Sequence, residues 1–402
     1  VYKRQARSTS DDILVVPPGH VTVFDAVEGG LTASPPADAR DRAARKRPRI
    51  EIIEGSGARA GHSLQMGLGI DAGGTYTDAV IYDEERSLVV AKAKSPTTPD
   101  DLTIGVGGAI SAVLEVAGVE PAQIDMVALS TTLATNALVE NKGRTGCLVL
   151  IGMEPKTLER GGLGEAVHDD RIIFVAGGHD SHGQEGQPLD EATLTSAISE
   201  VADQVDAFAV TAEFSVRNPS HELTALRLIS EHTSKPATAS HTLSAKLNGP
   251  RRAVTALLNA RLIALTDELL EAAITTLTGL GVNAPLMVVR GDGSLVSTEF
   301  AKARPIETIL SGPAASVVGA AHLVDVSDAI VADMGGTTTD IAVLRDGRPH
   351  VTAEGAVVGG HETMVEAVAI RTSGLGGDSE VCLAPSAVGP QLLLGPRRVV
   401  PS

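Results

Sequence analysis

Two copies of an eight-residue motif carry the groups from which a nucleotide-phosphate site could be built. The first reads D-A-G-G-T-Y-T-D from Asp71 to Asp78, and the second reads D-M-G-G-T-T-T-D from Asp333 to Asp340, so that six of the eight positions are identical. Glycine lets backbone N–H groups approach an anion closely. Threonine hydroxyls add donors, and an aspartate can hold Mg²⁺ or orient a water. The pair therefore predicts two loops that grip the phosphates of one nucleotide from both flanks.

Each motif lies between two short apolar runs, which predicts a β-hairpin with a tight Gly-Gly turn. The runs are Gly67–Ile70 and Ala79–Tyr82 around the first motif, and Ala329–Ala332 and Ile341–Leu344 around the second. The alternative for a single copy is an ordinary hairpin whose Asp and Thr side chains close the turn locally. A second copy in the same strand context favours the phosphate-binding interpretation.

The residue types in the loops suggest a role for each position. Asp71 and Asp333 are the predicted catalytic carboxylates, acting as Mg²⁺ ligands or by orienting water. Asp78 and Asp340 are expected to brace their loops, as turn carboxylates usually do. The residues predicted to bind phosphate are Gly73, Gly74, Thr75, Gly335, Gly336, Thr337 and Thr338.

The rest of the chain supplies the elements that must position these loops. Strand and helix patterns alternate from Met66 onward, and the hairpin-first unit occurs twice, which predicts a duplicated α/β architecture. The Gly-rich loops fall at strand ends, where open α/β sheets bind ligands. Helices are predicted at about 100–117, 191–205, 219–232 and 251–280, and strands at 87–93, 126–130, 147–151, 207–211 and 286–289.

Residues 1–65 differ from the remainder and read as an irregular extension. Pro17-Pro18, Pro35-Pro36 and a basic run at 40–49 interrupt any sustained period, and only two short β-like pieces occur, at 13–16 and 50–53. Disorder or a loosely attached appendage explains this pattern. A second hypothesis is that these residues are an artefact of sequence assembly and that Met66 is the true start.

Composition excludes several classes of function. The formal net charge of −17 argues against nucleic acid or an anionic membrane as a partner. No apolar run approaches the roughly 20 residues of a membrane span, and no signal-peptide pattern opens the chain. Cys147 and Cys382 form neither a disulfide framework nor a metal pattern, which is typical of a cytoplasmic protein. The chain has no Walker loop, zinc-helix motif or nucleophile elbow.

Other polar positions have two interpretations each. Thr132, Thr135 and Asn136 follow a predicted strand and could contact substrate, or they could cap the next helix. Arg252 could bind a carboxylate or phosphate of the substrate in bidentate fashion, or lie solvated on a helix surface. Asp292 could close its own Gly turn, and Ser311 could cap a helix.

The segment Gly177–Gly183 invites a metal hypothesis. It places His179, Asp180 and His182 close together in sequence. Without further ligands at set spacings, a solvated loop explains the same residues.

Several longer stretches resemble a known family. Both loops, together with Gly374–Ser379 (G-L-G-G-D-S), resemble the phosphate and adenosine motifs of the actin, sugar-kinase and Hsp70 ATPase superfamily. Within it, Ser130–Ala137 (S-T-T-L-A-T-N-A) and Phe214–His221 (F-S-V-R-N-P-S-H) look like the hydantoinase A / 5-oxoprolinase family, as do Glu307–Gly319 and 252–260. The similarity extends from about Met66 to the C-terminus.

The resemblance implies a duplicated actin-like (ribonuclease H-like) fold with two lobes around a nucleotide cleft. The expected lobes are 66–250, with the first loop, and 251–402, with the second. Gly376, Gly377 and Asp378 would lie near the adenosine of ATP, and Mg²⁺ would accompany it. The implied reaction is ATP-dependent opening of a cyclic amide through phosphorylation of the ring carbonyl, with a hydantoinase B-like subunit as partner and an oligomeric assembly. A conformational ATPase that activates a partner protein and a small-metabolite kinase are the alternatives.

Three positions depart from the family pattern. Arg251 stands where relatives have Glu, Ala369 stands where they have an acid, and Asp378 stands where they often have Gly. If the replaced acid contacts metal or water, catalytic turnover is in doubt. The chain also ends soon after the adenosine-type loop, so its C-terminal part is expected to be truncated.

Overall fold

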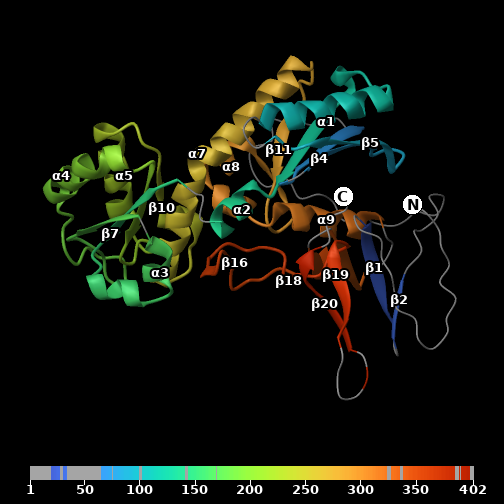
Figure 1. Cartoon of the computed structure of the whole chain (residues 1–402). Helices are drawn as coiled ribbons and strands as arrows, with labels where there is room; N and C mark the ends of the chain where they lie inside the picture. The colour runs from blue at the N-terminus through green and yellow to red at the C-terminus, as the bar shows by residue number, and fades with distance from the viewer. Residues whose placement is uncertain are drawn as a thin grey trace. The chain divides into compact units, whose positions relative to one another are not determined.

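The chain folds as an α/β protein with mixed sheets, as the computed structural model shows (Figure 1). The structure describes residues 20–27, 30–33, 65–74, 76–98, 102–140, 144–168, 170–323, 327–335, 338–384, 389 and 391–398. Two compact units are present. The first comprises Val1–Asp41, Ser316–His350 and Ile370–Ser402, and the second comprises Arg42–Ala315 and Val351–Ala369.

The second unit contains a six-stranded mixed sheet that carries the first motif. In spatial order its strands are β12 (Leu295–Ser297), β11 (Leu286–Val289), β6 (Met126–Thr131), β3 (Met66–Ala72), β4 (Tyr76–Asp83) and β5 (Leu88–Pro96). β3, β4 and β5 form an antiparallel meander, whereas β6 runs parallel to β3 and β11 runs parallel to β6. A meander extended by two parallel strands is the arrangement that a ribonuclease H-like fold requires, and this prediction is confirmed.

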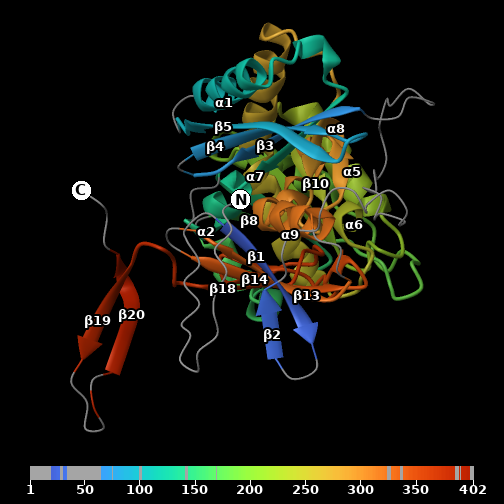
Figure 2. The ribbon, with the colours of Figure 1, turned by 90° about the vertical axis from the view of Figure 1, so that its right-hand side faces the viewer.

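Two helices cover one face of this sheet (Figure 2). They are α1 (Leu102–Ala117) and the C-terminal half of α7 (Gly249–Gly279). Ile110 and Val113 of α1 join Leu269 and Leu277 of α7 in one apolar cluster with strand residues such as Ile81. Each large side chain buried in this way contributes about 1.5–3 kcal/mol relative to an exposed one, so the helices hold the hairpin in place.

A second, parallel sheet lies in the same unit. Its order is β10 (Ala237–Ala239), β9 (Ala207–Ala212), β7 (Gly146–Ile151) and β8 (Arg171–Val175). Every residue of β7 and β9 is buried, as expected for strands that are covered on both faces. Helices α4 (Glu191–Val201) and α5 (Ser220–His232) contribute to the core on one face, and α3 (Leu163–Val167) and α7 contribute on the other.

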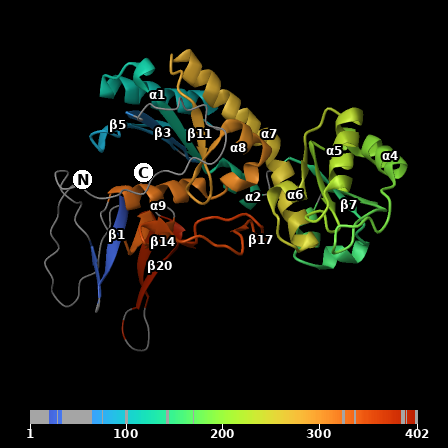
Figure 3. The same ribbon diagram turned by 180° about the vertical axis from the view of Figure 1, so that it is seen from behind.

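α7 joins the two sheets of this unit (Figure 3). Its N-terminal half, which includes Ala253 and Leu262, packs in the core of the parallel sheet. Its C-terminal half, which includes Leu269 and Leu277, packs on the mixed sheet. The predicted helix at 251–280 is confirmed, and its burial at both ends fixes the two sheets to one rigid axis.

The first unit contains the sheet that carries the second motif. Its strands are β15 (Arg348–Pro349), β14 (Thr339–Arg345), β13 (Ala329–Met334), β1 (His20–Val27) and β2 (Gly30–Ala33), and β18 (Ile370–Ser373) also pairs with β14. The β13–β14 pairing sets Asp333 opposite Asp340, and the β3–β4 pairing sets Asp71 opposite Asp78. The same register in both hairpins confirms the predicted duplication.

Sequence patterns missed two strands in the first 65 residues. β1 pairs with β13 along six positions, from His20 opposite Met334 to Asp25 opposite Ala329. The run V-T-V-F in β1 has strong β propensity, but its partner lies about 300 residues away, so the local pattern alone did not reveal the strand. The β-like pieces predicted at 13–16 and 50–53 lie outside the described residues.

Shorter elements complete the two units. In the second unit, α2 (Leu133–Val139), α6 (Ser240–Leu243), α8 (Thr298–Ala303) and the hairpin β16–β17 (Val357–Val358, His361–Glu362) connect the sheets, and α9 (Ser311–Leu323) begins there. In the first unit, β19 (Ser379–Ala384) and β20 (Gln391–Arg398) form a two-stranded ribbon. Among the described helices, none is long and apolar enough to cross a membrane. The predicted lobe boundary at residue 250 remains a prediction.

Candidate functional site

The carboxyl ends of β3 and β6 bring Asp71 together with the S-T-T-L-A-T-N-A segment. The two strands are parallel neighbours, and Asp71 is paired with Ser130 in their register. The Ser130 hydroxyl donates to Asp71 Oδ1 at 2.7 Å. Ser130 is buried whereas Asp71 is exposed, so the hydrogen bond orients a carboxylate that still faces outward.

The first Gly-Gly loop is closed by its own backbone. Gly73 N–H donates to the carbonyl of Tyr76 at 3.1 Å, and the Gly73 carbonyl accepts from Thr97 Oγ1 at 2.8 Å. A Cβ on Gly73 would lie 2.8 Å from the Tyr76 carbonyl oxygen, so this position requires glycine. Gly73 therefore shapes the loop, while Gly74 is exposed beside it. Thr75 lies outside the described residues.

The second loop closes in the same way. Gly335 N–H donates to the carbonyl of Thr338, and the Gly335 carbonyl accepts from Gly377 N–H, both at 2.9 Å. Thr339 Oγ1 donates to the Leu375 carbonyl at 2.6 Å. The structure thus brings the predicted adenosine segment against the second phosphate loop, within one unit. Gly336 and Thr337 lie outside the described residues.

The Gly374–Ser379 segment is itself a closed turn. Gly376 N–H donates to Ser379 Oγ at 2.9 Å and Gly376 is buried, whereas Gly377 is exposed and Asp378 is half-buried. Asp333 is also half-buried, at the end of β13. Of the three positions that depart from the family pattern, only Asp378 lies within these motifs. Arg251 is in the first turn of α7, with Nη1 3.8 Å from Glu362 Oε2, and Ala369 is half-buried beyond β17.

The polar residues of α2 face two different partners. Thr132 occupies the N-cap position without a side-chain capping bond, and its Oγ1 instead accepts from Asn136 Nδ2 at 3.3 Å. Thr131 Oγ1 makes the capping contact, to Leu133 N–H at 3.0 Å. The capping interpretation of Thr132 is therefore wrong. Asn136 is exposed. It lies close to the first loop, since a Cβ on Gly74 would be 3.4 Å from its Nδ2.

The turn at Ser311 and Gly312 also belongs to this site, although the sequence predicted only a helix cap for Ser311. Ser311 Oγ donates to the Thr131 carbonyl at 2.9 Å and accepts from Thr131 N–H at 3.1 Å, so Ser311 joins two segments in addition to starting α9. A Cβ on Gly312 would lie 3.6 Å from Asp71 Oδ1 and 3.5 Å from Thr132 Cγ2. The sequence feature that could have indicated this role is the S-G-P motif, which was interpreted only as the start of a helix.

These residues fit a nucleotide that brings its own Mg²⁺. Among the described residues, no group of three or more His, Cys, Asp and Glu side chains could hold a metal ion. Mg²⁺ usually keeps several waters and is bound by one or two carboxylates together with substrate phosphates, so single carboxylates such as Asp71 and Asp333 suffice. The two glycines that lack a Cβ beside Asp71 and Asn136, Gly312 and Gly74, keep that surface open.

The second aspartate of each motif contacts a neighbouring strand, as expected for a brace. Asp78 lies 3.3 Å from Lys94 Nζ on β5, and both side chains are about half exposed. Asp340 accepts from Thr372 Oγ1 on β18 at 2.6 Å. Burial raises the pKa of the Asp340 carboxyl, the Thr372 hydroxyl lowers it, and the nearby Asp333 raises it again, with a net upward shift.

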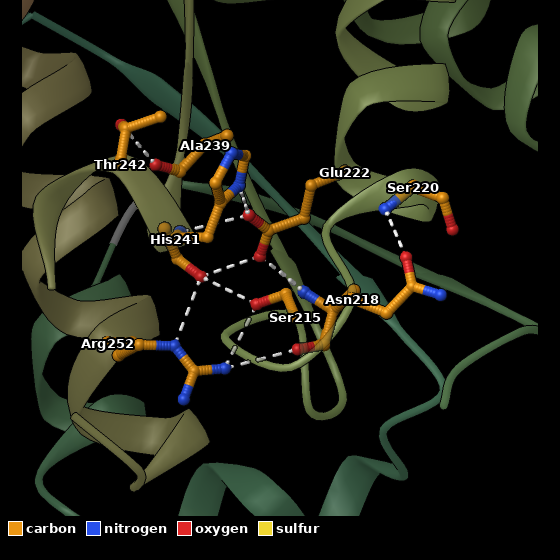
Figure 4. Close-up of polar contacts among 10 residues, drawn as sticks. Ser215, Asn218, Ser220, Glu222, Ala239, His241, Thr242 and Arg252 are labelled. Carbon is orange, nitrogen blue, oxygen red and sulfur yellow. Dashed lines mark hydrogen bonds and ion pairs between the residues drawn. The ribbon is translucent and has the colours of Figure 1, made fainter. Parts of the chain in front are cut away.

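Arg252 is buried at the edge of the parallel sheet, which contradicts the solvated-surface interpretation (Figure 4). Its Nη2 donates to Ser215 Oγ at 3.1 Å and to the Ala212 carbonyl at 3.2 Å, and its Nε donates to Ser240 Oγ at 3.3 Å. Ser240 Oγ in turn donates to Glu222 Oε1 at 2.6 Å. Burial lowers the pKa of Arg252, against the raising effect of Glu222. These protein contacts occupy the guanidinium that was predicted to contact substrate.

Glu222 is the fully buried acid of the same network. It accepts from the Ala212 N–H at 2.9 Å and from both the backbone and the imidazole Nδ1 of His241 (Figure 4). Burial acts to raise the pKa of Glu222, but the hydrogen bonds from His241 and Ser240 outweigh it, so that the pKa is lowered. Glu222 therefore contacts His241 directly and Arg252 through the Ser240 hydroxyl.

The segment around His179 does not form the hypothesised metal site in the described part of the chain. Asp180 Oδ1 accepts from the backbone N–H groups of His182 and Gln184, which closes the loop as the alternative predicted. His179 is buried rather than solvated, with Nε2 3.1 Å from Ser220 Oγ and its ring centroid 4.3 Å from that of His221, the two rings being tilted by 43°. Asp292 also closes its own turn, since Oδ1 accepts from Ser294 N–H at 2.9 Å.

Comparisons with known proteins agree with this arrangement. Residues 67–233 match the family model described as the hydantoinase/oxoprolinase N-terminal region, and residues 252–393 match the model described as hydantoinase/oxoprolinase. The chain is 30% identical to caprolactamase subunit alpha of Pseudomonas jessenii, over 78% of this chain and 48% of that protein. It is 27% identical to the acetophenone carboxylase gamma subunit of Aromatoleum aromaticum, over 82% of this chain and 49% of that protein.

One solved structure supports both the fold and the resemblance. The crystal structure of the ATP-dependent caprolactamase from Pseudomonas jessenii matches with a TM-score of 0.70 and 26% identity, and covers 83% of this chain and 51% of that chain. The chain spans about half the length of the curated relatives it matches. The predicted family resemblance and α/β fold are confirmed by these matches.

The raised pKa of Asp340 predicts a pH-dependent stability difference. Because the folded state binds this proton more tightly than the unfolded chain does, the associated stability is present below the unfolded pKa of about 3.9 and is lost as pH rises through the folded pKa. Asp340→Asn, which stays neutral, should be more stable than the wild type at neutral pH, and the difference should shrink toward about pH 3. Urea unfolding across this range measures it; a difference that does not change with pH would contradict the assignment. Asp78→Asn, which loses only an exposed ion pair, should change stability by less than about 1 kcal/mol.

The burial of Arg252 predicts a large loss of stability on truncation. Arg252→Met removes the donor of the buried Ser215 hydroxyl and Ala212 carbonyl, and each polar group left without a partner should lower the free energy of unfolding by about 1–3 kcal/mol. Arg252→Lys keeps the charge and should lose less. Arg227→Met is the matched control, because Arg227 is an exposed arginine with two exposed ion pairs, and its free energy of unfolding should stay close to that of the wild type. Urea unfolding decides the matter, and an Arg252→Met variant of wild-type stability would show that the network is not a structural one.

Proposed function

The chain belongs to the hydantoinase/oxoprolinase family, and on that premise we propose that it binds ATP and uses it to open a cyclic amide. The observation that supports the proposal most strongly is the repeated loop. Two Gly-Gly turns, each closed by the same backbone hydrogen bond and each preceded by a strand-end aspartate, occur in one chain. Two anion-binding turns with one carboxylate each suit a polyphosphate and its Mg²⁺.

Most of the predicted residues keep a role in this proposal, whereas Arg252 does not, because its guanidinium is occupied by protein contacts. Asp71 and Asp333 would hold Mg²⁺ or orient the attacking water. Asn136 and Thr132, beside Asp71, would contact the ring substrate, and the exposed Gly377 and half-buried Asp378 would lie near adenosine. The phosphates would be bound from the first loop by Gly74 and Thr75, with Gly73 setting the turn, and from the second by Gly336, Thr337 and Thr338, with Gly335 setting the turn.

The chemistry explains why ATP is needed. Amide resonance makes the ring carbonyl a weak electrophile, and an amide nitrogen is a poor leaving group. Transfer of the γ-phosphoryl group to the carbonyl oxygen releases ADP and makes the carbon electrophilic. One water then adds to that carbon, the C–N bond breaks with protonation of nitrogen, and a second water releases phosphate from the resulting acyl phosphate. The protein contributes positioning and charge neutralisation, which are the main requirements of phosphoryl transfer.

A second reaction is compatible with the same site. One similar protein is named as a caprolactamase subunit and another as a carboxylase subunit, so relatives are named for both amide opening and carboxylation. Both relatives are named as subunits, which supports a partner chain, and we propose a hydantoinase B-like one. Carboxylases are matched in sequence and in fold as well, and ring opening is preferred because the caprolactamase subunit has the higher sequence identity, 30% against 27% for the acetophenone carboxylase subunit.

The test is ring-dependent release of ADP. The purified chain, alone and with a co-expressed hydantoinase B-like subunit, is incubated with Mg·ATP and with ε-caprolactam, 5-oxoproline or hydantoin. We expect one ring to stimulate ADP release together with formation of the ring-opened product. Asp71→Asn should reduce the stimulated rate by roughly 10²–10³-fold, the loss that follows removal of a group that stabilises developing charge.

Other outcomes would overturn the proposal in distinct ways. Stimulation by acetophenone with bicarbonate, and by no ring, would favour carboxylation. Stimulation by a partner protein alone, without ring opening, would favour the conformational ATPase. A phosphorylated metabolite that accumulates with ADP would identify a kinase.

A further inference from the structure

We propose that Glu307, held by Arg290, is a positioning residue that sets the Ser311–Gly312 turn against Asp71. The proposal rests on the proposed function, because it assigns to Asp71 a role in nucleotide-dependent turnover. It goes beyond that function by identifying a distant ion pair on which the geometry of the Asp71 carboxylate depends.

The ion pair lies at the end of β11. Arg290 follows the last residue of β11, and its Nη2 is 2.5 Å from Glu307 Oε2, while its Nη1 is 3.0 Å from Asp292 Oδ2. The side chain of Glu307 is only 7% exposed and that of Arg290 only 16%. Arg304 approaches the other oxygen, with Nη1 3.5 Å from Glu307 Oε1. A buried carboxylate with two guanidinium partners resists displacement, because its charge cannot be left unpaired without a large cost.

The backbone around Glu307 is held equally closely. Gly291 N–H donates to the Glu307 carbonyl at 2.8 Å, and a Cβ on Gly291 would lie only 2.4 Å from the Ile309 carbonyl oxygen. Only glycine allows this approach. Asn259 of α7 accepts from Ile306 N–H at 3.0 Å. The segment 306–309 is therefore fixed both to the end of β11 and to α7.

The next residues transmit this position toward the site. Leu310 has φ of 59°, a left-handed conformation that is strained for leucine, and its N–H donates to Thr135 Oγ1 at 3.0 Å. Ser311 then makes its two hydrogen bonds with Thr131, and Ser311 and Thr131 are both buried. The turn ends at Gly312, where an added Cβ would be in van der Waals contact with Asp71 and Thr132, so the backbone passes close to both side chains.

These contacts, which lead from Glu307 through Leu310 to Ser311, predict that loss of the ion pair affects function as well as stability. Neutralising Glu307 leaves Arg290 without its main partner, which would let Leu310 relax and move Ser311 away from Thr131. A displacement of about 1 Å at a catalytic group can reduce turnover 10²-fold. A comparable ion pair, Arg261 with Asp170, is just as buried (8% and 3% exposed) but joins α7 to the segment before β8 in the parallel sheet. Its loss should affect stability alone.

The experiment compares Glu307→Gln and Ser311→Ala with the matched control Asp170→Asn, all in the full chain. Stability is measured by urea unfolding, function by ADP release at saturating Mg·ATP and ring substrate, and position by hydrogen exchange of the Thr131 N–H. We expect Glu307→Gln and Ser311→Ala to lower the rate about 10- to 100-fold and to speed exchange at Thr131. Asp170→Asn, which also loses stability, should keep the rate and the exchange within about twofold of the wild type, since the site is intact.

Each result has a distinct meaning. If Glu307→Gln loses no more rate than Asp170→Asn and leaves exchange at Thr131 unchanged, the positioning role is wrong. If exchange at Thr131 rises but the wild type itself shows no nucleotide turnover, the proposed function fails while Glu307 still sets the turn, and the inference is then overturned as a statement about catalysis. A loss of rate without faster exchange would show that Glu307 acts by another route and would also overturn the inference.

Discussion

Two hydrogen bonds between Ser311 and Thr131 join the start of α9 to the carboxyl end of β6 in the mixed sheet. They join residues 180 positions apart, both side chains are buried, and a lost partner would leave a polar group without compensation from water. Through them, a segment that follows β12 is held beside the end of β6, whose last residue is Thr131. The surroundings of Asp71 therefore depend on chain that is remote in sequence, which explains why the site needs the whole unit rather than the hairpin alone.

The long helix α7 supplies the frame for that contact. One half is buried in the parallel-sheet core and the other in the mixed-sheet core, and Asn259 in the N-terminal half accepts from the backbone N–H of Ile306. The buried Arg252 and Glu222 network fixes the start of the helix to the ends of β9 and β10. This network maintains the scaffold, whereas Asp71 is exposed at the carboxyl end of β3. The division agrees with the general observation that sites combine rigid support with a few accessible groups.

The sequence predicted the parts of the fold that carry local signals. The apolar runs and the Gly-Gly turns were visible in the sequence, so both hairpins were predicted, whereas the pairing of Asp71 with Asp78 is a finding of the structure. Arg252 and β1 were misread because their environments come from distant segments: one arginine in a helix looks alike whether it meets water or Ser215 and Ser240. Ser311 was singled out in a motif, but its partner Thr131 could not be inferred from spacing. Long-range contacts, rather than residue type, set these roles.

The central claim is that the two Gly-Gly loops bind the phosphates of ATP, and calorimetric titration of the chain with Mg·ATP tests it most directly. We expect one binding site. ATP should bind at least tenfold more tightly than adenosine because the loops contact phosphate, which is a difference of about 1.4 kcal/mol or more in binding free energy. Asp333→Ala should weaken binding of Mg·ATP, while Asp78→Asn, a change in an exposed brace, should not. Equal affinity for ATP and adenosine, or binding that is unaffected by Asp333→Ala, would contradict the account.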